Sequence, residues 1–322
     1  MNTENKTYSG FIAIIGPTNA GKSTLLNRIM DRKVSIVSHK VQTTRTRLRA
    51  VKMVGARQLI FVDTPGIFKP ARRLDRAMVG AALDAVGDAD AVLLVIDAQK
   101  GVTETVRHLV ARFQNVGRKE DVAGDDKKTT PALCELCSPT LFVALNKVDA
   151  IRRQDLLPIA AELSEMADFK EIFMISALKN DGLDGMLDSL AAVIPENPYF
   201  FDAADAPDVP DNLYLAELTR ERIYKYIHQE LPYHIYVETE KVDVDPEGVL
   251  EIYQKIVVHS EGHKKIVVGK GGAQLKKIGT EARHDIQDQW GVNARLHLFV
   301  RVEPDWENKP ENYEAQGLEF KK

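Results

Sequence analysis

The chain has 322 residues, which is long enough for two domains, and its hydrophobic fraction of 44% is ordinary for a globular protein. A net charge of −4 is too small to indicate one strongly charged partner for the whole chain. The first nine residues are polar, and no apolar run approaches the ~18 residues that a membrane span needs. We therefore expect a cytoplasmic protein without a secretory signal or a transmembrane segment.

Residues 16–23 fit the phosphate-loop pattern G-x-x-x-x-G-K-[ST]. They lie between an apolar run at 11–15, which predicts a buried strand, and residues 24–30, which begin like a helix. Glycines at this place let successive N–H groups and the helix N-terminus surround a polyphosphate. We expect Lys22 to reach the β- and γ-phosphates and the Ser23 hydroxyl to bind Mg²⁺. The expected nucleotide contacts of this segment are Gly16, Pro17, Thr18, Asn19, Ala20, Gly21, Lys22, Ser23 and Thr24.

A second predicted strand, at 57–62, ends in the tetrapeptide D-T-P-G. The carboxylate of Asp63 at such a strand end can hold Mg²⁺ through water, and the N–H of Gly66 can contact a γ-phosphate. Ile67 follows, and isoleucine cannot hydrogen-bond the attacking water. We therefore predict slow unassisted hydrolysis, on the order of 10⁻⁴ to 10⁻³ s⁻¹. The expected nucleotide contacts here are Asp63, Thr64, Pro65, Gly66 and Ile67.

The polar segment at 42–45 lies between these two motifs and offers a further hydroxyl for Mg²⁺. We favour Thr44 and keep Thr43 as the competing choice, with a loop that has no metal role as the third reading. The predicted catalytic set is then Lys22, Thr44 and Gly66, with Ser23, Thr44 and Asp63 at the metal. The side-chain carbonyl of Asn19 is a candidate ligand for K⁺ beside the phosphates; the alternative is that Asn19 only shapes the loop.

Two more buried strands are predicted at 91–96 and 140–145, and the second ends in N-K-V-D. The Asp149 carboxylate can accept hydrogen bonds from guanine N1–H and the 2-amino group, whereas adenine would leave it without a donor. We expect Lys147 to lie along the base and Asn146 to tie this loop to the phosphate loop. The expected contacts of this segment are Asn146, Lys147, Val148 and Asp149.

A last strand of this region is predicted at 173–177 and ends in Ser176 and Ala177, whose main chain can bind guanine O6. Strands and helices alternate throughout, and the motifs all fall at carboxyl ends of strands. This pattern predicts an α/β domain with a mainly parallel sheet and helices on both faces. We place this domain at 8–196, with an insertion near 115–139. The insertion holds Cys134 and Cys137, read as ordinary thiols, with a redox pair or half a metal site as alternatives.

A proline-rich linker is expected at 197–211, a second domain at 212–303 and a tail at 304–322. The second domain has the predicted order helix, strand, strand, short helix, G-x-x-G at 269–272, helix, strand, which resembles a smaller α+β KH domain of the bacterial type. Its glycine loop would clamp single-stranded RNA by the backbone.

Charge placement supports that reading of the second domain. From residue 205 to the end there are 16 basic and 22 acidic residues, a net charge of −6, yet residues 263–283 alone carry +5. A basic strip in an acidic domain fits a track for phosphates; the alternative is a solvated helix face beside a glycine turn. The expected RNA contacts are Lys264, Lys265, Gly269, Lys270, Gly271, Gly272, Lys276 and Lys277.

Taken together, these motifs resemble the Era family of bacterial GTPases over roughly residues 10–303. The matching features are Asn19 in the phosphate loop, Q-T-T-R at 42–45, D-T-P-G at 63–66 before an apolar residue, N-K-V-D at 146–149 and V-G-K-G-G at 268–272. The chain departs from the family at Pro17-Thr18, where Arg-Pro is usual, in the 115–139 insertion and in the acidic tail, to which we assign no role.

The resemblance implies an RNA-binding GTPase that uses GTP, GDP and Mg²⁺ and acts in assembly of the 30S ribosomal subunit. It implies binding of single-stranded 16S rRNA near its 3′ end, and peripheral contact with the inner membrane. We expect a monomer without an obligate protein partner. Two alternatives stay open, a signalling GTPase whose second domain binds a protein and an RNA-binding module that holds GTP without turnover. A route of coupling through Arg72, Arg73 or the helix at 212 is a further expectation.

Overall fold

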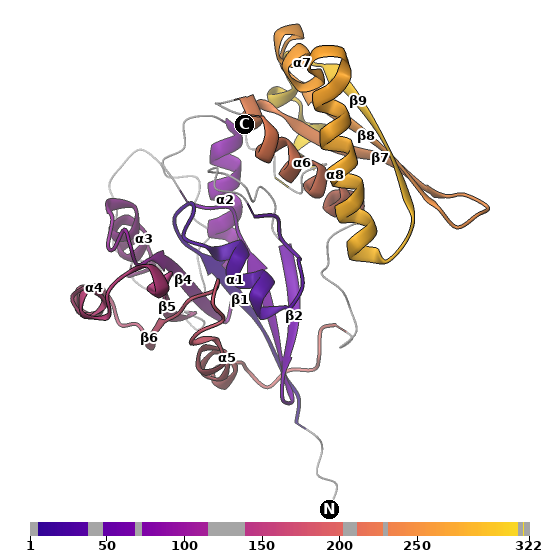
Figure 1. The fold of residues 1–322 in the computed structure, drawn as a ribbon. Helices are drawn as coiled ribbons and strands as arrows, with labels where there is room; N and C mark the ends of the chain where they lie inside the picture. Colours follow the sequence, from indigo (N-terminus) through magenta and orange to yellow (C-terminus); the bar gives the residue numbers. More distant parts are fainter. Residues whose placement is uncertain are drawn as a thin grey trace, which may run out of the picture. The chain divides into compact units, whose positions relative to one another are not determined.

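The computed structural model describes residues 6–37, 48–67, 73–114, 139–201, 211–227, 231–314 and 318. The chain divides into two compact units, residues 1–35 with 44–208 and residues 36–43 with 209–322 (Figure 1). Across the described ranges we find no helix that is long and apolar enough to cross a membrane.

The first unit is built on a sheet of six strands in the order β2-β3-β1-β4-β5-β6, counted over the described ranges. Only β2 runs antiparallel, to β3, and the remaining pairs are parallel. All seven residues of β4 are buried, as a parallel strand covered on both faces requires. The strands are β1 (Tyr8–Ile15), β2 (Leu48–Val54), β3 (Arg57–Asp63), β4 (Ala91–Asp97), β5 (Thr140–Asn146) and β6 (Glu171–Met174).

Helices lie on both sides of this sheet (Figure 1), which confirms the predicted fold class. One core cluster joins alternate residues of the strands, such as Ala13 and Ile15 of β1, to the apolar faces of the helices α2, α3 and α4. The helices are α1 (Lys22–Ile29), α2 (Arg73–Gly87), α3 (Glu104–Gln114), α4 (Arg153–Met166) and α5 (Leu183–Ala192).

Strand β6 ends at Met174, earlier than the 173–177 strand that the sequence predicts, so that expectation is wrong at its carboxyl end. The N–H and C=O of Ser176 pair instead with Asp181, at 3.0 and 3.1 Å, and close a turn. Ser176 and Ala177 therefore lie in a loop, where their main chain is not used by a neighbouring strand.

The second unit has a sheet in the order β7-β8-β9, with β7 and β8 antiparallel and β8 and β9 parallel. Ile223, Ile256 and Ile278 of different elements meet in its core. The observed order confirms the KH-type arrangement predicted for this part. Its elements are α6 (Asp211–Tyr226), β7 (Tyr236–Val244), β8 (Leu250–Val258), α7 (Glu261–Val268), α8 (Ala273–Trp290) and β9 (Ala294–Val302).

The tail after β9 is part of the second unit's packing. Trp306 has no exposed surface and stacks on Tyr236 of β7, with ring centroids 5.8 Å apart. Tyr236 alternates along β7 with Val237, which packs among the helices, so the tail covers the opposite face of the sheet. Tyr313 and Leu318 are buried as well.

We expect the substitution Trp306→Ala to lower the free energy of unfolding by about 3–5 kcal/mol, because it empties a fully buried aromatic site. Trp290→Ala is the matched control: Trp290 is 39% exposed and touches Tyr214 edge-on, so its loss should cost only about 1 kcal/mol. Urea denaturation followed by circular dichroism measures both. A loss for Trp306→Ala no larger than the ~1 kcal/mol expected for Trp290→Ala would show that the tail does not stabilise the second unit.

Candidate nucleotide and nucleic-acid sites

The phosphate loop leaves β1 through a backbone turn that only glycine permits. Gly16 has φ 147°, and a Cβ there would lie 2.2 Å from the carbonyl oxygen of Val95. Gly21 has φ 96° directly before α1, and a Cβ there would lie 2.3 Å from Nδ2 of Asn146. Asn19 also has positive φ, 63°, a conformation that asparagine tolerates better than most residues. The loop is therefore closed tightly against β4 and β5 before α1 begins.

Lys22 lies at the start of α1 with its side chain turned back over the loop. Its Nζ donates to the carbonyl oxygens of Gly16 and Pro17, both at 3.1 Å, and the residue is 6% exposed. Burial lowers the pKa of Lys22 to about 8, and the nearby charge of Asp63 opposes that shift. A buried ammonium of this kind would gain from an anionic phosphate placed against it.

Asp63, at the end of β3, is fully buried beside two hydroxyl groups. Its Oδ2 accepts hydrogen bonds from Ser23 and Ser35, each at 3.0 Å, whereas its Oδ1 has no partner among the described residues. Burial raises the pKa of Asp63, and the charge of Lys22 together with the two hydroxyl groups acts against this. Carboxylate and hydroxyl oxygens in one pocket suit Mg²⁺, so this donor set fits the expected ion. Ser35 carries no motif, and the sequence did not indicate it.

The segment after Asp63 lies directly against the phosphate loop. The N–H of Ile67 donates to the carbonyl of Gly16 at 3.0 Å, and a Cβ on Gly66 would lie 2.8 Å from Cγ2 of Thr18. The Thr64 hydroxyl bonds the carbonyl of Ile14 at 2.8 Å. Ile67 is only 8% exposed, and its side chain belongs to the core.

Asn146, at the end of β5, joins three loops. Its Nδ2 donates to the carbonyl of Ala20 at 3.0 Å, and its Oδ1 accepts from the N–H groups of Lys147 and Ala177. Asp149 accepts a 2.6 Å bond from the Ser176 hydroxyl. The side chain expected to read guanine therefore lies beside the loop expected to bind O6.

Lys147 has φ 68° and extends over the phosphate loop. Its Nζ donates to the carbonyl of Asn19 at 2.7 Å and to Oδ2 of Asp97 at 2.6 Å. Asp97 ends β4 and is 6% exposed. Asp97 belongs to no motif, although its place at the end of a buried strand, like that of Asp63, was a usable signal.

Some predicted residues lie outside the part of the chain that the structure describes. These are Gln42 to Arg45, including both candidate threonines, Arg72, and most of the insertion with Cys134 and Cys137. The metal role of Thr44 therefore stays a prediction. Within the described ranges there is no cluster of three or more histidine, cysteine or acidic side chains able to hold a metal ion.

The glycine loop of the second unit joins α7 to α8 with three positive φ values, at Gly269, Gly271 and Gly272. A Cβ on Gly269 would lie 2.6 Å from Cβ of Gln274, whereas the space beside Gly271 and Gly272 is open. Any larger residue at 269 would push α8 away, and the two open glycines leave the backbone accessible to a ligand.

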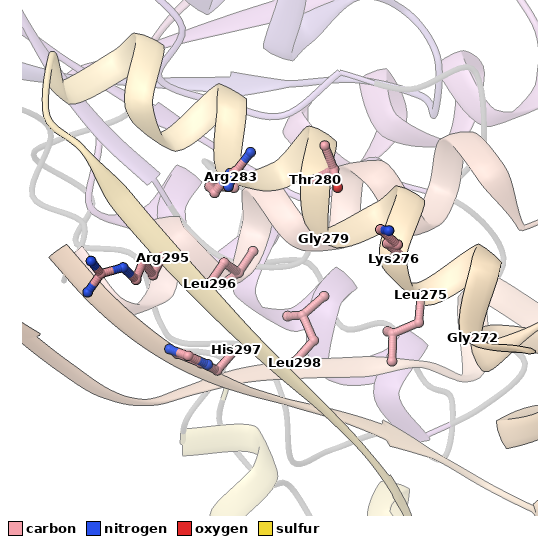
Figure 2. Close-up of a pocket in the computed structure, with 10 residues that line it drawn as sticks. All are labelled: Gly272, Leu275, Lys276, Gly279, Thr280, Arg283, Arg295, Leu296, His297 and Leu298. Atoms are coloured by element: carbon pink, nitrogen blue, oxygen red, sulfur yellow. The ribbon is translucent and has the colours of Figure 1, made fainter. Parts of the chain in front are cut away.

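A cavity of about 460 Å³ lies between α8 and β9, next to this loop. Figure 2 shows Leu275, Leu296 and Leu298 between the helix and the strand, where they form an apolar floor. A Cβ on Gly279 would lie 3.2 Å from Leu298, so the small residue keeps helix and strand close. The full lining is Gly272, Leu275, Lys276, Gly279, Thr280, Arg283, Arg295, Leu296, His297 and Leu298.

The structure separates the predicted RNA-binding lysines. Lys276 lines the cavity, but Lys277 points toward α6, with Nζ 4.1 Å from the ring centroid of Tyr226. Lys264 and Lys265 lie on α7, and Lys270 lies in the glycine loop. The residues Gly279, Thr280, Arg283 and the β9 lining were missed, although 276, 279, 280 and 283 share one face of a helix.

A phosphate loop, a buried Asp63 and an N-K-x-D segment at the carboxyl ends of a mainly parallel sheet define a guanine-nucleotide-binding P-loop protein with a second, KH-type unit. Residues 11–124 match the family described as 50S ribosome-binding GTPase, and residues 230–307 match the KH domain family. GTPase Era of Rhizobium meliloti (strain 1021) is 44% identical over 316 residues, covering 98% of this chain and 94% of that protein. GTPase Era of Agrobacterium fabrum is 42% identical over 314 residues, covering 98% and 92%. The chain belongs to the Era family of GTPases.

Solved structures agree with this assignment. The crystal structure of Era in complex with MgGDPNP and nucleotides 1506–1542 of 16S ribosomal RNA has a TM-score of 0.85 and 33% identity, covering 97% of this chain and 99% of that one. A tyrosine-to-alanine variant of Aquifex aeolicus Era bound to GDP and AlF₄⁻ gives the same values.

Proposed function

We propose that this protein is a GTP-hydrolysing switch that binds single-stranded 16S rRNA near its 3′ end and acts in assembly of the 30S ribosomal subunit. The observation that carries the proposal is that one chain holds two sites. The first is the phosphate loop with its guanine-reading loops. The second is the cavity beside the glycine loop, with its apolar floor and with Lys276, Arg283 and Arg295 as its basic rim. The related Era structure that holds a 16S rRNA segment supports it.

In the nucleotide site, Lys22 and the loop amides would bind the phosphates, and Ser23 and Asp63 would hold Mg²⁺ with Thr44. The ion, when bound, supplies neutralisation of charge on the phosphates. Ser35 would keep Asp63 oriented, since it donates to the same oxygen as Ser23. The N–H of Gly66 would contact the γ-phosphate, and its closeness to Thr18 supports that placement.

Hydrolysis without a partner would be slow, because the apolar side chain of Ile67 lies in the core and cannot orient the attacking water. We propose K⁺ bound through Asn19 as the missing positive charge. The GTPase rate should then be at least about tenfold higher in K⁺ than in Na⁺ buffer, and Asn19→Ala should remove the difference. Phosphate release at equal ionic strength measures this, and equal rates in the two buffers for the unaltered protein would reject the K⁺ site.

In the second unit, bases would lie on the leucine floor and phosphates would meet the glycine loop and the basic rim. We propose the GTPase domain at 8–196 and the KH-type domain at 212–303. Gln58 accepts bonds from the N–H groups of Phe200 and Phe201, at 2.9 and 3.2 Å, so the start of the linker is fastened to the first domain. We place the protein in the cytoplasm with its ribosomal partner, as a monomer; peripheral contact with the inner membrane stays a prediction.

The RNA site is tested by Lys276→Ala against Lys277→Ala. The probe is an RNA with the sequence of 16S nucleotides 1506–1542, titrated at several salt concentrations in the presence of GTP. Loss of Lys276 should weaken binding and lower the salt slope by about 1, because one phosphate contact is removed. Loss of Lys277 should have a smaller effect, since that side chain is held over Tyr226.

Equal effects of the two variants would contradict the cavity as the RNA track. Absence of RNA binding by the unaltered chain would favour the alternative, a GTPase whose second domain binds a protein. Multiple-turnover release of phosphate from GTP separates both from a module that holds GTP without turnover.

A further inference from the structure

Arg28, in the last turn of α1, contacts the loop that follows β6. Its Nε donates to the carbonyl of Ala177 and its Nη2 to the carbonyl of Leu178, both at 3.2 Å. Two nitrogens of the planar guanidinium therefore donate to two successive carbonyl groups. Because α1 begins at Lys22, this side chain links the helix behind the phosphate loop to the loop expected to bind guanine O6.

The hydrogen bonds of that loop leave the amide of Leu178 for a ligand. The N–H of Ala177 donates to Asn146, at 3.0 Å, and the N–H of Lys179 donates to the Ser176 hydroxyl, at 3.1 Å. The N–H of Leu178, which lies between them, makes no hydrogen bond within the described residues. Leu178 as a residue is also 65% exposed.

The carbonyl of Ala177 and the N–H of Leu178 belong to the same peptide group. A trans peptide is planar, and its C=O and N–H point in opposite directions. A bond from Arg28 to the carbonyl therefore sets the direction of the N–H on the other side. A charged donor also polarises the peptide and makes its N–H a stronger donor.

We propose that Arg28 is a positioning residue for guanine recognition, which holds the peptide between Ala177 and Leu178 so that the Leu178 N–H donates to guanine O6. The proposal rests on the GTP-binding function proposed above and adds a determinant of base choice to it. Adenine carries an amino group in place of O6, so a fixed N–H at this point would repel it.

The test compares Arg28→Ala with Arg32→Ala, an exposed arginine four residues further along the chain. Three diphosphates are titrated by calorimetry with Mg²⁺. They are GDP, IDP, which keeps O6 and N1–H but lacks the 2-amino group, and the diphosphate of 2-aminopurine riboside, which lacks both O6 and N1–H. Arg28→Ala should weaken GDP and IDP alike, by about three- to tenfold, and leave the 2-aminopurine nucleotide unchanged. Arg32→Ala should change none of the three.

An equal loss for all three nucleotides, or no loss for GDP, would overturn the proposal, since a merely structural role does not depend on O6. Thermal unfolding without nucleotide shows whether Arg28→Ala is folded, and Arg28→Lys, which keeps one charged donor, should give a smaller loss confined to the nucleotides with O6. If the unaltered protein binds GDP no better than the 2-aminopurine nucleotide, the guanine site itself fails. If it prefers GDP and Arg28→Ala keeps that preference, only the role of Arg28 fails.

Discussion

Replacing Asp149 with asparagine should lower the affinity for GTP by about 100-fold or more and raise the affinity for xanthosine triphosphate. The carboxylate can accept from two guanine donors, whereas an amide offers one acceptor and places its NH₂ against the other donor. Xanthine has a carbonyl in place of the 2-amino group, which the new NH₂ can satisfy. Asparagine also keeps an oxygen for the Ser176 hydroxyl, now 2.6 Å from Asp149, so the loop should stay folded.

Asp181→Asn is the matched control, because Asp181 is an exposed aspartate in the same loop, paired to Ser176 through its main chain. Competition between a labelled GDP and unlabelled GTP, XTP and ATP measures the change. A uniform loss for the three triphosphates would mean that Asp149 supports the loop and does not read the base. An unchanged GTP affinity would show that the guanine site does not lie at the carboxyl end of β5.

Replacing Lys22 with alanine should abolish GTP turnover and weaken nucleotide binding by about 100-fold or more, because a desolvated ammonium facing the phosphates is lost. Lys100→Ala, at an exposed position, is the control and should leave both quantities unchanged. Single-turnover phosphate release and calorimetry measure the two effects. Turnover by Lys22→Ala at the rate of the unaltered protein would place the phosphates elsewhere.

The same lysine predicts a pH dependence. Burial lowers the pKa of Lys22 to about 8 in the free protein, and a bound polyphosphate would raise it, since an anion favours the charged form. GTP binding is then coupled to proton uptake and should weaken as the pH rises above about 8, by up to tenfold per unit. Lys22→Ala should lose this dependence. A GTP affinity that is equally flat in both proteins between pH 7 and 8.5 would contradict it.

The nucleotide motifs could be read from the chain because each is local. The strand at 8–15, the glycine turn and the helix from Lys22 are consecutive, and the φ values of Gly16 and Gly21 explain why the spacing is strict. Motifs that follow buried strands also predict their own assembly, since carboxyl ends of parallel strands meet at one edge. The KH-type order of the second unit was also predictable, because the spacing of apolar residues switches between that of a helix and that of a strand from one segment to the next.

The residues that hydrogen-bond to those motifs could not be predicted from the sequence, because they come from elements that only the folded sheet brings together. Ser35 reaches Asp63, Asp97 reaches Lys147 and Arg28 reaches Ala177 across 28, 50 and 149 positions of the chain. The spacing of apolar residues along the chain does not predict such pairs. They follow from the strand order, which places β1 between β3 and β4.

Side-chain direction was likewise settled by packing. The side chain of Ile67 lies in the core, while its predicted contact with the nucleotide stays a prediction. Of two adjacent lysines, Lys276 lines the cavity and Lys277 lies over Tyr226. Trp306 stands in a tail without a motif, yet it covers one face of the second sheet. The chain alone therefore defined the nucleotide chemistry and both folds, because these rest on local backbone geometry. The long-range contacts that hold the motifs in place came from burial, which joins residues distant in sequence.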